Sequence, residues 1–140
     1  MAGALRSPAL VVLLKEGCPC TRECHAELNL LAGACRGKLP FFGLLDAAPS
    51  AAKLLVRDAE LAFPVIPDPK LTQIRRLDGR AALGFRLVGS DGKLLGRWDG
   101  LSRANVAAMV TGVRRATGLS LVVDVNPFTV LTKIGCEFSK

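Results

Sequence analysis

The stretch that decides the fold is "PALVVLLKEGCPCTREC", residues 8–24. Residues 8–14 form a continuous apolar run of strand length, which is typical of a β-strand covered on both faces. Directly after it, three cysteines fall within seven residues, at Cys18, Cys20 and Cys24. Because the rest of the sequence is not disulfide-rich, we expect this cluster to carry chemistry, with core packing as the alternative.

The chain is long enough to bury a core without disulfide bonds. It has 140 residues, of which 50% are hydrophobic, and fits a single domain over 1–140 with a C-terminal extension over 119–140. Its 5 cysteines are an odd number, which excludes a framework that pairs all of them within one chain. We find no secretion leader and no apolar run of about 18 residues, the length that spans a bilayer. We therefore expect a cytoplasmic protein without a membrane partner.

The charge distribution argues against nucleic acid as a partner. The net charge is +7, but lysine and arginine are scattered along the chain, with no run longer than two. Aromatic residues make up 5% of the sequence and tyrosine is absent. The chain therefore has few side chains on which the bases of a single-stranded nucleic acid could stack. The charge predicts a solvated basic surface.

Helix and strand patterns alternate along the rest of the chain. Four helix starts are marked by a side chain suited to capping, namely Thr21, Ser50, Asp68 and Ser102. The first of these helices carries its apolar positions at Cys24, Leu28, Leu31 and Cys35. Buried strands are predicted over 41–46 and 65–66, and "GSDG" at 89–92 joins 82–88 to 93–99 as a β-hairpin. This order predicts an α/β protein with a central mixed β-sheet flanked by helices on both faces.

The order of these features resembles a known family. A buried strand that runs into a cysteine cluster, followed by "FPVIPDP" at 63–69 and "DGKLLGRW" at 91–98, resembles the thioredoxin-like redoxins. More narrowly, it resembles the branch shared by peroxiredoxins and bacterial thiol oxidoreductases, and "IGCEF" at 134–138 is similar to the glycine-cysteine ending of some members. The resemblance implies a thioredoxin-like fold and a thiol-dependent redox enzyme without a cofactor. A disulfide or peroxide would be the substrate, and a protein or small thiol the reductant, of a monomer or weak dimer.

The cysteine cluster suggests roles for individual residues. With Thr21 as cap, Cys24 would lie in the first turn of a helix, where free backbone N–H groups lower the pKa of a thiol. Thr21 and Cys24 also resemble the Thr-x-x-Cys motif of peroxiredoxins, which implies Cys24 as the reactive residue and Thr21 as a peroxide ligand. Cys20 lies four residues before Cys24, a spacing that a disulfide accepts. Cys18 is a second pairing option, and Cys136 in the tail is a possible resolving thiol.

Two other functions remain open. Cys20 and Cys24 also resemble the copper site of Sco-type assembly factors, and soft thiolates suit Cu(I). The histidine that completes such a site is missing, because the single histidine, His25, lies beside Cys24. The chain can also be a non-catalytic thioredoxin-fold binding protein.

Several expected features are absent or have a plain explanation. Redoxins carry a proline just before the hairpin, where this chain has "AALG" at 81–84, and the peroxiredoxin arginine must be replaced by Arg80 or Arg86. Cys35 lies on the apolar stripe of its helix, so we expect a packing residue.

Overall fold

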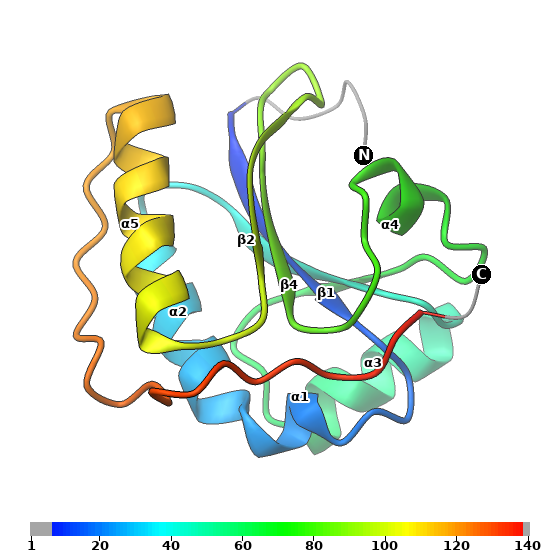
Figure 1. Cartoon of the computed structure of the whole chain (residues 1–140). Coiled ribbons are helices and arrows are strands. Elements are labelled where there is room, and N and C mark those ends of the chain that lie inside the picture. Colours follow the sequence, from blue (N-terminus) through cyan, green and yellow to red (C-terminus); the bar gives the residue numbers. More distant parts are fainter. Residues whose placement is uncertain (1–6, 139–140) are drawn as a thin grey trace.

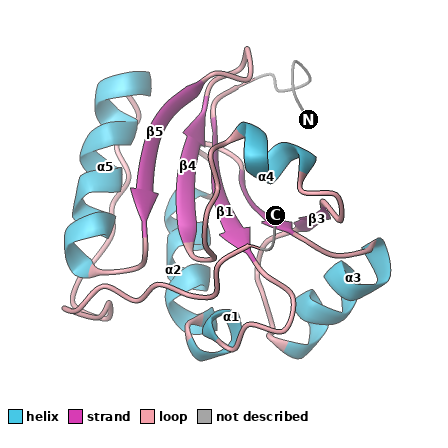
Figure 2. Ribbon diagram, turned by 45° about the vertical axis from the view of Figure 1, so that its right-hand side comes forward, coloured by secondary structure: helices cyan, strands magenta, loops and turns pink. Residues whose placement is uncertain are grey.

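The computed structural model describes residues 7–138, which form one five-stranded sheet with helices on both faces (Figure 1, Figure 2). The strands are β1 (Ala9–Leu14), β2 (Phe41–Leu45), β3 (Val65–Pro67), β4 (Gly84–Val88) and β5 (Leu94–Asp99). Their order in the sheet is β3-β2-β1-β4-β5, in which β1, β2 and β3 are parallel while β4 is antiparallel to β1 and to β5. The predicted mixed sheet is confirmed.

Strand β1 lies at the centre of the sheet, between β2 and β4. All of its residues are buried. Successive side chains alternate between the two faces, so that Leu10 packs into one core and Val11 into the other. Because both faces are covered, this strand is a continuous apolar run rather than an alternating one.

The helices are α1 (Cys20–Glu23), α2 (His25–Cys35), α3 (Pro49–Asp58), α4 (Thr72–Arg76) and α5 (Arg103–Thr117). Helices α2 and α5 contribute Leu28 and Val113 to the larger core, on one face of the sheet. Helix α4 covers the other face, where Ile74 packs in the second core with residues of β1. The sheet therefore separates the cysteine cluster, which belongs to the larger core, from α4.

The predicted cap of α5 is confirmed, whereas that of α3 is wrong. Ser102 precedes α5, and its hydroxyl accepts a hydrogen bond from the Asn105 amide at 3.1 Å. Helix α3 begins at Pro49, a residue whose fixed φ suits the first turn, so Ser50 lies inside the helix and makes no cap.

The tail, residues 119–138, crosses the molecule without forming a helix or a long strand. In Figure 1 it runs beside α5 in orange and then passes near α1 in red. Leu121 and Phe128 are buried and anchor its first part to the larger core. Its last part pairs at two isolated bridges, Leu101 with Lys133 and Ala81 with Glu137. Within residues 7–138, no helix is both long enough and apolar enough to cross a bilayer.

Candidate functional site

The cysteine cluster begins where β1 ends. Five residues lead from the end of β1 to α1, and Cys18 lies in this connection while Cys20 opens the helix. Both are buried, with 7% and 8% of their surfaces exposed. Their sulfur atoms are 3.0 Å apart, within hydrogen-bond reach for two thiols. The structure thus brings together Cys18 and Cys20.

The predicted helix start at Thr21 is wrong. The turn begins earlier because Pro19, with φ −69°, already has a helical φ and serves as the N-cap of α1. Thr21 lies within α1, and its hydroxyl is buried without a hydrogen-bond partner among the described residues. Cys24 ends α1 and precedes α2, so it does not lie in the first turn of a helix that Thr21 caps.

The predicted lowering of the Cys24 pKa is also wrong. Cys24 is fully buried in the larger core, and burial raises the pKa of its thiol. Within residues 7–138, no side-chain hydrogen bond joins its sulfur to another cysteine, in contrast to Cys18 and Cys20. Pairing of Cys20 with Cys24 stays a prediction. The packing alternative fits Cys24 better than the role of nucleophile.

The tail brings Cys136 to the same place. Its backbone amide donates a hydrogen bond to the Cys18 sulfur at 3.1 Å, across 118 positions of sequence. Gly135 lies against both thiols, since a Cβ atom there would be 2.5 Å from the Cys20 sulfur and 3.1 Å from the Cys18 sulfur. Cys18, Cys20 and Cys136 therefore form one group, the thiol site.

The three thiols have different tendencies to ionise. Burial works to raise the pKa of Cys18, but hydrogen bonds from the thiols and amides of Cys136 and Cys20 outweigh it and lower that pKa. Burial and the neighbouring Cys18 raise the pKa of Cys20 to about 12. The hydrogen bond with Cys18 is the largest cause of the raised pKa of Cys136. Cys18 is therefore the first of the group to become a thiolate.

A groove gives access to Cys18. It has a volume of about 280 Å³ and is lined by Lys15, Cys18, Pro19, Arg22, Leu54 and Leu55, among others. Lys15 forms an ion pair with Asp46 at 3.2 Å, and Arg22 lies 4.0 Å from Asp58. The groove combines an apolar wall from α3 with the basic side chains of Lys15 and Arg22.

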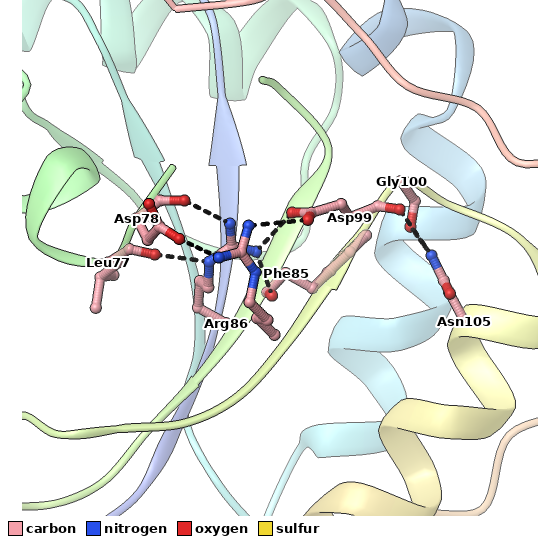
Figure 3. A network of polar contacts seen from close by, with 8 residues as sticks. Leu77, Asp78, Phe85, Arg86, Asp99, Gly100 and Asn105 are labelled. Carbon is pink, nitrogen blue, oxygen red and sulfur yellow. Dashed lines mark hydrogen bonds and ion pairs between the residues drawn. The ribbon is translucent and has the colours of Figure 1, made fainter. Parts of the chain in front are cut away.

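Arg86 does not replace the peroxiredoxin arginine at the thiol site. Phe85 and Leu87 point into the larger core, so Arg86, between them on β4, points to the opposite face. It is fully buried there, where its guanidinium donates hydrogen bonds to the carbonyl oxygens of Leu77, Asp78 and Phe85 (Figure 3). It also lies 3.0 Å from a carboxylate oxygen of Asp99. Arg86 has a structural role because its hydrogen-bonding capacity is used within the fold.

The remaining expectations concern Cys35, His25 and copper. Cys35 is 1% exposed in the larger core, as expected for a packing residue. His25 is half-buried, and its Nδ1 is 2.9 Å from the Arg22 carbonyl oxygen. Among residues 7–138, no group of three or more histidine, cysteine, aspartate or glutamate side chains is arranged to hold a metal ion. Copper binding by Cys20 and Cys24 stays a prediction.

The fold can now be compared with those of known proteins. No protein-family model and no curated protein sequence matches the chain. Solved structures do match it. An uncharacterized conserved protein from Geobacillus kaustophilus superimposes with a TM-score of 0.65 at 16% identity, covering 94% of this chain and 76% of that one. A secreted disulfide oxidoreductase from Mycobacterium tuberculosis gives 0.52 at 21% identity, covering 66% and 67%.

A third structure is the bacterioferritin comigratory protein of Xanthomonas campestris, which was described together with its alkyl peroxide reduction activity. It superimposes with a TM-score of 0.62 at 14% identity, covering 82% of each chain. The fold of this chain is therefore the thioredoxin-like fold of the redoxins. At these identities the likeness concerns the fold, so the chemistry must be argued from the thiol site.

Proposed function

We propose that this chain is a thiol-disulfide redox protein that uses Cys18 as its nucleophile. The observation that carries the proposal is the contact of the Cys18 and Cys20 sulfurs at 3.0 Å. Their unequal tendency to ionise supports it, since the thiolate is the form of cysteine that attacks. The groove that Cys18 lines offers a place where a small disulfide can bind beside it.

In the first step, the Cys18 thiolate attacks one sulfur of a substrate disulfide. A bond forms between Cys18 and that sulfur, the substrate disulfide breaks, and the second substrate sulfur leaves as a thiolate that takes a proton from water. The Cys18 charge disappears in this step. One of the causes that raises the pKa of Cys20 therefore disappears as well, and Cys20 can ionise more easily.

In the second step, the Cys20 thiolate attacks the Cys18 sulfur. A disulfide forms between Cys18 and Cys20, the bond between Cys18 and the substrate sulfur breaks, and that sulfur leaves as a thiolate that takes a proton from water. Both substrate sulfurs are then thiols, so the protein has lost two electrons and the substrate has gained them. A protein or small-molecule thiol then reduces Cys18 and Cys20 again. We place this cycle in the cytoplasm, where such reductants keep thiols reduced.

A thiol titration tests the proposal. Reduced protein is mixed with the disulfide of 2-mercaptoethanol, and its free thiols are counted over time. We expect the loss of two thiols per chain, and Cys18→Ser should slow it by about 100-fold or more because the nucleophile is gone. Cys35→Ser is the matched control, since Cys35 is buried in the core. If Cys18→Ser reacts like the native chain while folded, the proposal is wrong.

Peroxide reduction is a second candidate, favoured by the unpartnered hydroxyl of Thr21 next to Cys20. Here the Cys18 thiolate would attack the distal oxygen of a peroxide, and the O–O bond would break. The products are a sulfenic acid at Cys18 and an alkoxide, which takes a proton from water to become an alcohol. Condensation with the Cys20 thiol would then give the same disulfide and one water. Replacing the disulfide with cumene hydroperoxide in the titration distinguishes the two substrates. Thr21→Val should slow only the peroxide reaction, and equal effects on both reactions would contradict this role.

A further inference from the structure

The end of the tail is docked on the body of the protein through its backbone. We call residues 130–138 the strap. Lys133 and Leu101 exchange two backbone hydrogen bonds of 2.9 Å. The Gly135 amide donates to the Ala82 carbonyl oxygen at 3.1 Å, and the Ala82 amide donates to the Cys136 carbonyl oxygen at 2.9 Å. The strap thus lies antiparallel to the segment before β4, in the manner of an added strand.

The strap has no fully buried side chain, and only Phe138, at its end, packs partly buried against the two cores. Val130, Leu131 and Ile134 have 68%, 80% and 61% of their surfaces exposed. The preceding part of the tail differs, because Phe128 is 1% exposed and packs in the larger core. A segment held mainly by backbone hydrogen bonds opens at a lower free energy than one that buries apolar side chains. The strap should therefore open at a lower free energy than the part of the tail that Phe128 anchors.

Two glycines allow the strap to close over the thiols. Gly135 fits only because it has no side chain, since a Cβ atom would be 2.5 Å from the Cys20 sulfur. On the body, a Cβ atom at Gly100 would be 2.4 Å from the Thr132 side chain and 3.0 Å from the Ile134 side chain. A β-carbon at either position is incompatible with the observed spacing.

We propose that the strap is a displaceable cover of the thiol site, closed by strand addition along Ala82 and Leu101 and permitted by Gly135. In the open state, an extended polypeptide with a glycine next to its cysteine takes its place on the same backbone groups. This inference rests on the proposed function and adds a substrate class and a means of control. The strap occupies the backbone groups of Ala82 and Leu101 until a polypeptide competes for them, while the groove stays open to small disulfides. Cys136 is then the residue that a substrate cysteine replaces beside Cys18.

The first test uses hydrogen exchange of the full chain with Gly135→Ala. In the native chain the amides of Lys133, Gly135 and Phe138 donate to backbone oxygens, so they should be protected. In the variant we expect exchange at Lys133 and Phe138 to accelerate about tenfold or more, while amides of β1 keep their protection. Alkylation of Cys18 by a bulky maleimide, located by mass spectrometry, should accelerate as well.

The matched control is Gly33→Ala, in α2. A Cβ atom at Gly33 meets nothing within 4 Å, so this variant should leave both measurements unchanged. If Gly135→Ala leaves the exchange of Lys133 and Phe138 at the native rate, the proposed cover is wrong. The same holds if these amides are unprotected in the native chain.

The second test supplies a strap as a peptide. The hexapeptide Lys-Ile-Gly-Ser-Glu-Phe, with serine in place of the cysteine, is added to the Gly135→Ala chain during alkylation. We expect it to slow the alkylation of Cys18 severalfold, whereas Lys-Ile-Val-Ser-Glu-Phe should not. Equal protection by both peptides, or by neither, overturns the proposed polypeptide site.

These measurements need no redox turnover, so they separate the strap from the proposed function. Faster exchange and alkylation in Gly135→Ala, without any reduction of a disulfide by the native chain, would keep the strap and reject the redox function.

Discussion

At the scale of single residues, the neighbours of a cysteine decide its chemistry. Cys18 and Cys35 are both buried. Hydrogen bonds from neighbouring thiols and amides lower the pKa of Cys18 despite its burial. Cys35 has no such partners, and burial raises its pKa to about 12 although the charge of Lys38 opposes the shift. Cys18 is therefore suited to attack, and Cys35 is suited to packing.

We predict that Cys18 is alkylated as a thiolate of lowered pKa. With iodoacetamide, its rate should rise with pH to a midpoint below that of an ordinary cysteine. Cys136→Ala removes a thiol that stabilises the Cys18 thiolate, so it should raise the midpoint and slow the reaction at neutral pH about threefold. Mass spectrometry of quenched samples gives the rate at Cys18. In Cys35→Ala the midpoint should be unchanged, and an equal shift in both variants would contradict the assignment.

The sequence could locate the cluster but could not select the reactive cysteine. The selection depends on where the helix starts, and Pro19 moves that start ahead of Thr21. Cys24 then turns into the core, and Cys18 remains beside the groove. The contact with Cys136 spans 118 positions and has no local signal. Gly135 is required by that contact, because only glycine fits against the two sulfurs, but a glycine by itself does not predict it.

At the scale of elements, one buried cation joins α4 to the hairpin. The Arg86 guanidinium donates to the Leu77 carbonyl oxygen at 2.7 Å and to the Asp78 carbonyl oxygen at 2.9 Å, just after α4. It reaches Asp99 at the end of β5 as well (Figure 3). The buried charge is tolerated because each of the three guanidinium nitrogens donates a hydrogen bond to a backbone carbonyl oxygen.

We predict that Arg86→Met lowers the free energy of unfolding by about 3 kcal/mol, because it leaves buried carbonyl oxygens without donors. Arg97→Met is the matched control. Arg97 also pairs with Asp99, but its side chain is 37% exposed, so its loss should matter by less than about 1 kcal/mol. Urea unfolding measures both variants. Equal losses would show that the buried network does not stabilise the connection.

We also predict a difference between two serines that the sequence marks equally as helix caps. Ser102→Ala removes the acceptor of the Asn105 amide and should destabilise the fold by about 1 kcal/mol. Ser50→Ala should change the stability by less than about 0.5 kcal/mol, because Ser50 lies inside α3 and caps nothing. Thermal unfolding of both variants compares them. A larger loss in Ser50→Ala would contradict the observed start of α3.

The elements were predictable where one local pattern decides them. The buried strand β1 and the hairpin of β4 and β5 follow from apolar runs and a turn sequence. Helix α4 was expected to begin right after Asp68, but it begins at Thr72 because Leu71 adopts a left-handed φ of 62°. The Asp68 carboxylate instead accepts a hydrogen bond of 2.8 Å from the Ile74 amide, six positions further along the chain. Capping patterns do not encode such a contact.

At the scale of the whole molecule, buried thiols make stability depend on alkaline pH. Burial raises the pKa of Cys20 and Cys35 to about 12 and raises that of Cys24. These groups stay protonated in the folded chain but ionise in the unfolded chain above the ordinary cysteine pKa of about 8.5. The stability present below that value is therefore lost as the pH rises towards the folded pKa.

We predict that Tm falls between about pH 8.5 and about pH 10.5 under reducing conditions. Cys35→Ala should have a lower Tm at neutral pH, because it loses a packing group, but its Tm should fall less over this range. Calorimetry at several pH values measures both proteins. A decline of the same size in the variant would contradict a raised pKa of Cys35.

The arrangement of the whole chain was predictable as a class but not in detail. A mixed sheet with helices on both faces followed from the order of the elements, and the structure confirms it. The extension over 119–140 was expected, but the course of residues 119–138 was not, because it depends on the anchor at Phe128 and on backbone pairs with Ala82 and Leu101. Backbone hydrogen bonds use groups that nearly every residue has, so the sequence does not show which segments pair.

The contact between Cys136 and Cys18 has a consequence for the chain while it is being synthesised. The ribosome makes Cys18 118 positions before Cys136. During translation the nascent chain therefore has a Cys18 thiol without the amide and thiol that hold its charge. Cys18 in an unfinished chain should therefore ionise less readily than Cys18 in the folded protein, where Cys136 lowers its pKa.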